Sequence, residues 1–103
     1  MNSKILIQEI IFDSLQNINE DLPENKKLEI TIETPLYGIH GTLDSMALVN
    51  LILEVEDTIN VKFNTNILIV DEKALAKENS PFKTVAAFVN YVAELVNNAT
   101  SQN

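Results

Sequence analysis

Residues 44–59 read DSMALVNLILEVEDTI, and this stretch decides more of the fold than any other. Its apolar side chains recur at spacings of three and four positions, which places them along one side of an α-helix. The stripe predicted to face the core comprises Leu48, Ile52, Val55 and Ile59. Either Asp44 or Ser45 is expected to begin the helix, because short oxygen-bearing side chains accept hydrogen bonds from the amides of a first turn. The stretch therefore predicts an amphipathic helix that ends near Ile59.

Further segments before and after this one also have helical patterns. The stripe in residues 3–19 consists of Ile7, Ile11, Leu15 and Ile18. The stripe in residues 81–96 consists of Val85, Phe88, Val89, Val92 and Val96. Ser80 is suited to cap this last helix and Pro81 to occupy its first turn, where a missing amide hydrogen costs little. Residues 71–78 predict one short additional helix, and the polar residues after Val96 predict a frayed tail.

The connection between the first two helices is ambiguous. Apolar and polar side chains alternate in residues 28–33, which is typical of a strand, and Pro35, Gly38 and Gly41 then interrupt the pattern. We interpret this segment as an extended connection that its apolar side chains hold to the core. The alternative is a short strand, paired with residues 67–70.

Together these segments predict an all-α fold. It is a bundle of three main helices plus one short helix, with a long loop between helices one and two. A chain of 103 residues fits one domain. We expect that domain to span residues 1–98 and a polar C-terminal tail to follow at residues 99–103.

Composition excludes several classes of function. The chain has no cysteine, which removes disulfides, thiolate metal sites and a cysteine nucleophile. Its formal net charge is −8 and its 7 basic residues are all lysine, so it lacks the clustered cations that nucleic acids and anionic lipids attract. No apolar run reaches the roughly 18 residues of a bilayer span, and the N-terminus lacks a signal-peptide pattern. We expect an acidic cytoplasmic monomer that attracts basic partners.

Ser45 lies where loop becomes helix, and that place suits a phosphate. The first turn of a helix leaves amide groups without partners, and the peptide dipoles add partial positive charge there. The only two glycines, Gly38 and Gly41, allow another molecule to approach the serine closely. Asp44 is placed to cap the helix or to orient the metal and cofactor of a modifying enzyme. A phosphate ester on Ser45 is one interpretation, and the simpler one is that Asp44 and Ser45 are an ordinary helix start.

The motif GTLDSMALVNLILEVED, residues 41–57, resembles the second-helix signature of acyl carrier proteins. That signature is an Asp-Ser-Leu core after a glycine-bearing loop, followed by an apolar helix with acidic residues near its end. Met46 stands here where leucine is usual, and it is also an apolar residue of similar size. The upstream TPLYGIHGTLDS is similar to the loop of these proteins, and FKTVAAFVNYV, residues 82–92, to their last helix. The resemblance covers nearly the whole chain in the same order.

The resemblance implies a carrier rather than an enzyme. Ser45 would receive 4′-phosphopantetheine from coenzyme A through a phosphopantetheinyl transferase, with Asp44 as part of the modification motif. The thiol of this arm would hold an acyl group as a thioester for the acyl-loading and acyl-processing enzymes of fatty acid or polyketide biosynthesis. In some family members a tunnel between helices shelters the acyl chain. The residues that would line it here, for which plain core packing is the simpler interpretation, are Leu48, Ile52, Phe63 and Val85.

The helix at residues 44–59 has more apolar surface than one core stripe needs. Met46, Val49 and Leu53 are therefore candidates for a partly exposed docking surface. Acidic residues follow that surface, and in the family such acids meet basic patches on partner enzymes: Glu54, Glu56 and Asp57. The alternatives are that other parts of the chain cover the apolar residues and that the acids form a solvated helix face.

Other functions compete for the same residues. An aminoacyl or peptidyl carrier, loaded by an adenylating enzyme, would use Ser45 in the same way, although GTLDS lacks the paired glycines of many such carriers. A non-catalytic helical adaptor would need Ser45 only as a helix start. A hydrolase would require His40, Asp44 and Ser45 to converge, but a triad draws its members from separate elements and no Gly-x-Ser-x-Gly motif is present. One histidine and scattered carboxylates do not favour a metal site.

Overall fold

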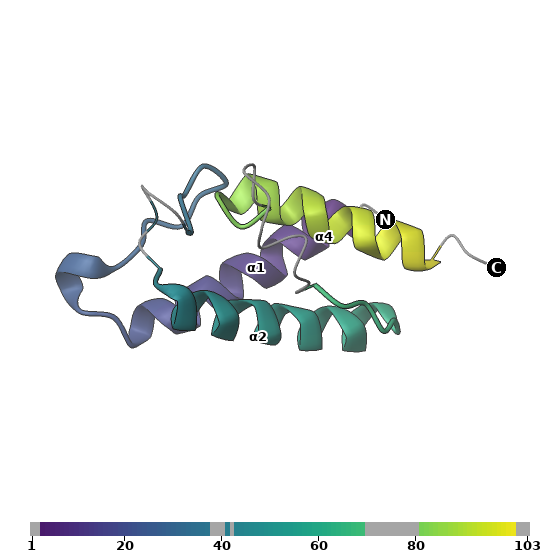
Figure 1. Ribbon diagram of the computed structural model, residues 1–103, viewed down its shortest axis with the longest axis horizontal. Coiled ribbons are helices and arrows are strands. Elements are labelled where there is room, and N and C mark those ends of the chain that lie inside the picture. Colours follow the sequence, from purple (N-terminus) through teal and green to yellow (C-terminus); the bar gives the residue numbers. More distant parts are fainter. Residues whose placement is uncertain (1–2, 38–40, 42, 70–80, 101–103) are drawn as a thin grey trace.

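A computed structural model describes residues 3–37, 41, 43–69 and 81–100 of the chain (Figure 1). Its α-helices are α1 (Ser3–Glu20), α2 (Ser45–Phe63) and α4 (Val85–Thr100), and a 3-10 helix at Glu24–Lys26 follows α1. The described residues contain no strand, which confirms the predicted all-α class. The short helix predicted at residues 71–78 lies outside the described residues.

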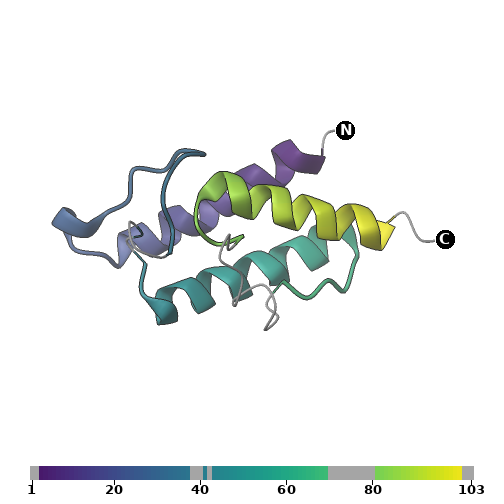
Figure 2. The same cartoon turned by 45° about the horizontal axis from the view of Figure 1, so that its top comes forward.

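Helix α1 joins the bundle together. It packs against both α2 and α4 and runs antiparallel to them, while α2 and α4 point in roughly the same direction (Figures 1 and 2). The segment between α1 and α2 lies at the end of the bundle where α2 begins (Figure 1). The first turn of α2 is therefore at one end of the molecule, next to this connecting segment.

The apolar stripe of α1 faces the core as its spacing predicts. Ile7, Ile11 and Leu15 are completely buried, and Ile18 is half-buried. Ser14 is buried among them, at 4% exposure. Among the described side chains no buried polar atom lacks a hydrogen-bond partner, so the Ser14 hydroxyl avoids the cost of unpaired burial.

Helix α2 buries its predicted stripe but is longer than predicted. The stripe residues are each at most 2% exposed: Leu48, Ile52, Val55 and Ile59. The expected end near Ile59 is wrong, because the helix continues to Phe63 and stops where Asn64 adopts a left-handed conformation with a φ of 54°. Asparagine adopts this conformation more readily than most residues, and helices commonly stop there. Residues 60–63, which were expected to end the helix, therefore form its last turn.

Helix α4 begins later than predicted. Its first residue is Val85, whereas Pro81 lies in a turn outside the helix, and Ser80 falls outside the described residues. Thr84 takes the capping role, since its Oγ1 accepts a hydrogen bond from the Ala87 amide at 3.1 Å. The cap predicted for this helix was thus placed on the wrong hydroxyl residue.

Carbonyl groups of the loop before α2 complete the first turn of α4. The Val85 amide donates to the Thr34 carbonyl at 3.0 Å, and the Ala86 amide donates to the Ile32 carbonyl at 2.8 Å. Because these amides are occupied by a distant loop, the helix cannot continue backwards through them. The far end also differs from the prediction, because residues 97–100, expected in a frayed tail, belong to the helix.

Residues 28–33 form an irregular, non-strand connection, in agreement with the preferred interpretation. Residues 67–69, the partner in the strand alternative, are irregular as well, and residue 70 is outside the described part. The one isolated bridge among the described residues is antiparallel and joins Pro35 to Thr84. The connection therefore pairs with the segment that precedes α4.

Asn19, near the end of α1, fixes the start of this connection. Its Oδ1 accepts a hydrogen bond from the Leu28 amide at 2.8 Å, and its Nδ2 donates to the Leu28 carbonyl at 2.9 Å. Leu28 is buried, but Ile32 is 47% exposed. The expectation that the apolar side chains of this segment hold it to the core is thus wrong for Ile32. This residue anchors the loop through its carbonyl, which accepts the hydrogen bond from the Ala86 amide.

Candidate functional site

The first turn of α2 places Ser45 at the surface. Asp44 precedes the helix with an extended backbone, and its Oδ1 accepts a hydrogen bond from the Ala47 amide at 2.8 Å. The Asp44 carbonyl accepts from the Leu48 amide at 2.9 Å. Asp44 is therefore the cap, and Ser45 is the first helical residue, with an exposed side chain. The Ser45 hydroxyl is not required for capping.

Tyr37 lies beside Ser45. The Tyr37 hydroxyl oxygen is 3.3 Å from Ser45 Oγ, and both side chains are exposed. Sequence reasoning did not single out Tyr37 as a site residue. The available signal was weak: it is the aromatic residue in the glycine-bearing loop that leads to Ser45.

An apolar stripe of α2 remains exposed next to Ser45. Met46 is 75% exposed, Val49 45% and Leu53 54%, and we call these three residues the exposed stripe. Their separations of three and four positions align them along the helix. Leu51, by contrast, is completely buried, so only part of the surplus apolar surface of this helix faces solvent.

The acidic residues proposed to meet partners have different surroundings. Glu54 and Asp57 are exposed, and Glu54 Oε1 accepts a hydrogen bond from Asn17 Nδ2 at 3.2 Å. Glu56 is half-buried, and its Oε2 accepts from the Ile69 amide at 2.8 Å. Glu56 thus ties the segment after α2 back to the helix, and a basic group of a partner would have to share it.

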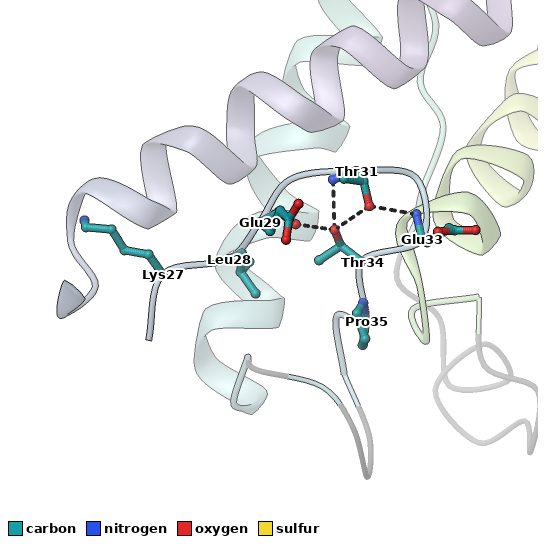
Figure 3. Close-up of a pocket in the computed structure, with 7 residues that line it drawn as sticks. All are labelled: Lys27, Leu28, Glu29, Thr31, Glu33, Thr34 and Pro35. Atoms are coloured by element: carbon teal, nitrogen blue, oxygen red, sulfur yellow. Dashed lines mark hydrogen bonds between the residues drawn. The ribbon is translucent and has the colours of Figure 1, made fainter. Parts of the chain in front are cut away.

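The residues proposed to line an acyl tunnel pack into the core. Leu48, Ile52 and Val85 are at most 2% exposed, and Phe63 is half-buried. A pocket of about 360 Å³ lies instead in the connection before α2 (Figure 3). Its lining residues are Lys27, Leu28, Glu29, Thr31, Glu33, Thr34 and Pro35.

Several polar groups at this pocket bond to one another (Figure 3). Thr34 Oγ1 accepts a hydrogen bond from the Thr31 amide at 2.9 Å and donates to the Glu29 carbonyl. The Glu33 amide donates to Thr31 Oγ1 at 3.2 Å. These bonds shape the turn, and none of the site residues proposed from the sequence lines the pocket.

The described residues give no support to the hydrolase or to a metal site. His40, needed by the hydrolase alternative, lies outside them, and Asp44 is engaged with the Ala47 amide. Across the described ranges, no three side chains of His, Cys, Asp or Glu gather in a way that could hold a metal ion. No helix built from the described residues combines the length and the apolar character needed to cross a bilayer.

Comparison of the chain with family models, with curated proteins and with solved structures finds no match. The candidate site therefore rests on the residues around Ser45 and their geometry. It consists of the Asp44 cap, the exposed Ser45 hydroxyl, the adjoining Tyr37 and the exposed stripe.

Proposed function

We propose that this protein is a carrier that holds acyl intermediates as thioesters on a 4′-phosphopantetheine arm attached to Ser45. The observation that supports this proposal most is an exposed serine at the first position of α2. Asp44 is a separate cap, and the exposed stripe directly follows the serine. The carrier is a cytoplasmic monomer that presents cargo and catalyses nothing itself. Acyl and aminoacyl cargo share this chemistry, because the thiol of the arm holds either one as a thioester.

The residues around Ser45 fit a phosphate ester. The exposed side chain is accessible to a transferase, and modification would leave the cap intact because Asp44 supplies it. The dipole of α2 favours an anion at this end of the helix. In the transfer, Ser45 Oγ bonds to the phosphorus that carries pantetheine, the bond from this phosphorus to the adenosine bisphosphate breaks, and the serine proton passes to a base of the transferase. The bound arm supplies a thiol, which the cysteine-free chain lacks.

The exposed stripe supports a docking role beside the arm. Large apolar side chains that gather at a surface commonly mark contact with another protein. A partner seated on Met46 and its neighbours would have its active site close to Ser45. Glu54 and Asp57 would meet basic groups of that partner, and the net charge of −8 would steer it towards the carrier at low ionic strength.

Intact mass before and after incubation with coenzyme A and a broad-specificity phosphopantetheinyl transferase tests the proposal. We expect the wild-type chain to gain the mass of one phosphopantetheine. Ser45→Ala should stay folded and gain nothing, while the matched control Ser3→Ala, a serine at the first position of α1, should gain the group normally.

The opposite result has a clear meaning. If the folded wild-type chain gains no mass while a known carrier in the same reaction is fully modified, the carrier proposal is wrong. The helical adaptor, with α2 as a plain docking surface, would then replace it. Modification that persists in Ser45→Ala would place the attachment at another residue.

A further inference from the structure

Several contacts hold the backbone of Tyr37 close to the start of α2. The preceding residue, Leu36, is completely buried, and its amide donates to the Lys83 carbonyl at 2.9 Å. The Leu36 carbonyl in turn accepts from the Leu43 amide at 3.0 Å. Gly41 packs against the same place: a Cβ there would lie 2.6 Å from the Leu36 oxygen and from both N and Cα of Tyr37. Only glycine allows the loop to close this tightly.

The side chain of Tyr37 completes the approach through its hydroxyl, 3.3 Å from Ser45 Oγ. This is a long hydrogen bond between two neutral, exposed groups, and such a bond contributes little. A phosphate ester changes the partner: the phosphorus bonded to Oγ then carries two non-bridging oxygens that share one negative charge. A hydrogen bond to a charged acceptor is roughly twice as strong as one between neutral groups.

We propose that Tyr37 is a positioning residue for modified Ser45: its hydroxyl donates a hydrogen bond to a phosphate oxygen of the attached arm. This inference rests on the proposed function, since it requires a phosphate at Ser45. The chain has no arginine and a net charge of −8, and the Tyr37 phenol offers a neutral donor beside that position. The hydrogen bond fixes the root of the arm against the first turn of α2 and restricts the directions in which the arm can leave.

A thermodynamic cycle tests this role. The Tm is measured for unmodified and modified protein, in the wild type and in Tyr37→Phe, which keeps the ring and removes the hydroxyl. Tyr91→Phe is the matched control, because the Tyr91 hydroxyl donates to the Ile69 carbonyl at 3.3 Å and has no part in the site. The ³¹P resonance of each modified protein provides a second readout, which reports on the phosphate itself.

We expect Tyr37→Phe to lower the Tm of the modified protein more than that of the unmodified one, and to shift the ³¹P resonance. Tyr91→Phe should lower both Tm values equally and leave the resonance in place. Equal losses from Tyr37→Phe, with an unchanged resonance, would show a merely structural tyrosine and overturn the inference. So would a Tyr37→Phe protein that stays folded but cannot be modified, because Tyr37 would then serve the transferase rather than the arm. If the wild type itself gains no group, the proposed function fails first and the inference falls with it.

Discussion

The two apolar faces of α2 are alike in sequence and opposite in environment. The buried face comprises Leu48, Leu51, Ile52, Val55 and Ile59, each at most 2% exposed. The exposed stripe lies on the same helix, and its least exposed member, Val49, still shows 45% of its surface. The contrast is sharpest between neighbours, because Ile52 is completely buried and Leu53 is 54% exposed.

This difference separates what folds the protein from what remains for other molecules. Full burial of a side chain such as Ile52 contributes about 1.5–3 kcal/mol relative to leaving it exposed. Leu53 contributes much less, since over half of it meets water. Folding therefore does not explain the exposed stripe, and a docking role would.

The largest expected effect is on the buried face. Ile52→Ala removes a completely buried side chain and leaves a cavity, so we expect a loss of about 2–5 kcal/mol in the free energy of unfolding. Leu53→Ala, one position along, should change it by no more than about 0.5 kcal/mol. Urea denaturation measures both values. Similar losses in the two variants would mean that the two faces do not differ as described.

The cap at the N-terminus of α2 should have an intermediate effect on the free energy of unfolding. Asp44→Ala removes the hydrogen bond to the Ala47 amide, and loss of such a cap costs about 0.5–2 kcal/mol. Asp57→Ala removes an exposed acid from the same helix and serves as the control. A cap variant as stable as the control would show that another group satisfies the first-turn amides.

The smallest effect on stability belongs to the exposed stripe, where function should respond instead. Leu53→Ser should change the free energy of unfolding by no more than about 0.5 kcal/mol, yet slow the transfer of phosphopantetheine through a raised KM. Val61→Ser is the matched control, since Val61 is 77% exposed on α2 but further from Ser45. Initial rates over a range of concentrations of this protein give the comparison. An equal rise of KM in both variants would mean that the exposed stripe has no special role.

Periodicity located the helices, both ends of α1 and the start of α2, but it misplaced the end of α2 and both ends of α4. The stripes of α1 and α2 face the core as predicted, because spacings of three and four bring apolar side chains to one side whatever surrounds them. The predicted end at Ile59 and start at Pro81 are wrong by contrast. Asn60 shows why at the first of these: its side chain bonds to both the amide and the carbonyl of Ile67, so polar residues that suggested a loop stabilise the helix end.

The candidate site divides in a similar way. Ser45 and Asp44 stand out in the sequence because a hydroxyl and a carboxylate directly before an apolar helical pattern indicate a helix start. Tyr37 does not, since its approach to Ser45 depends on the close packing of Gly41 against the loop backbone. The hydrogen bond from the Ile69 amide to Glu56 likewise joins residues that are far apart in the sequence, and no pattern near either residue predicts it.

The sequence by itself determined the all-α class, the core stripes and an oxygen-bearing start for α2, because each depends on side chains within one or two helical turns of each other. The tertiary structure alone decided where α4 begins, which acid holds the segment after α2 to the helix, and which aromatic side chain lies beside Ser45. Those features depend on backbone and side-chain groups that meet only after the loops and helices have packed together. Patterns of neighbouring residues do not predict such contacts, because the contacts depend on how the whole chain packs.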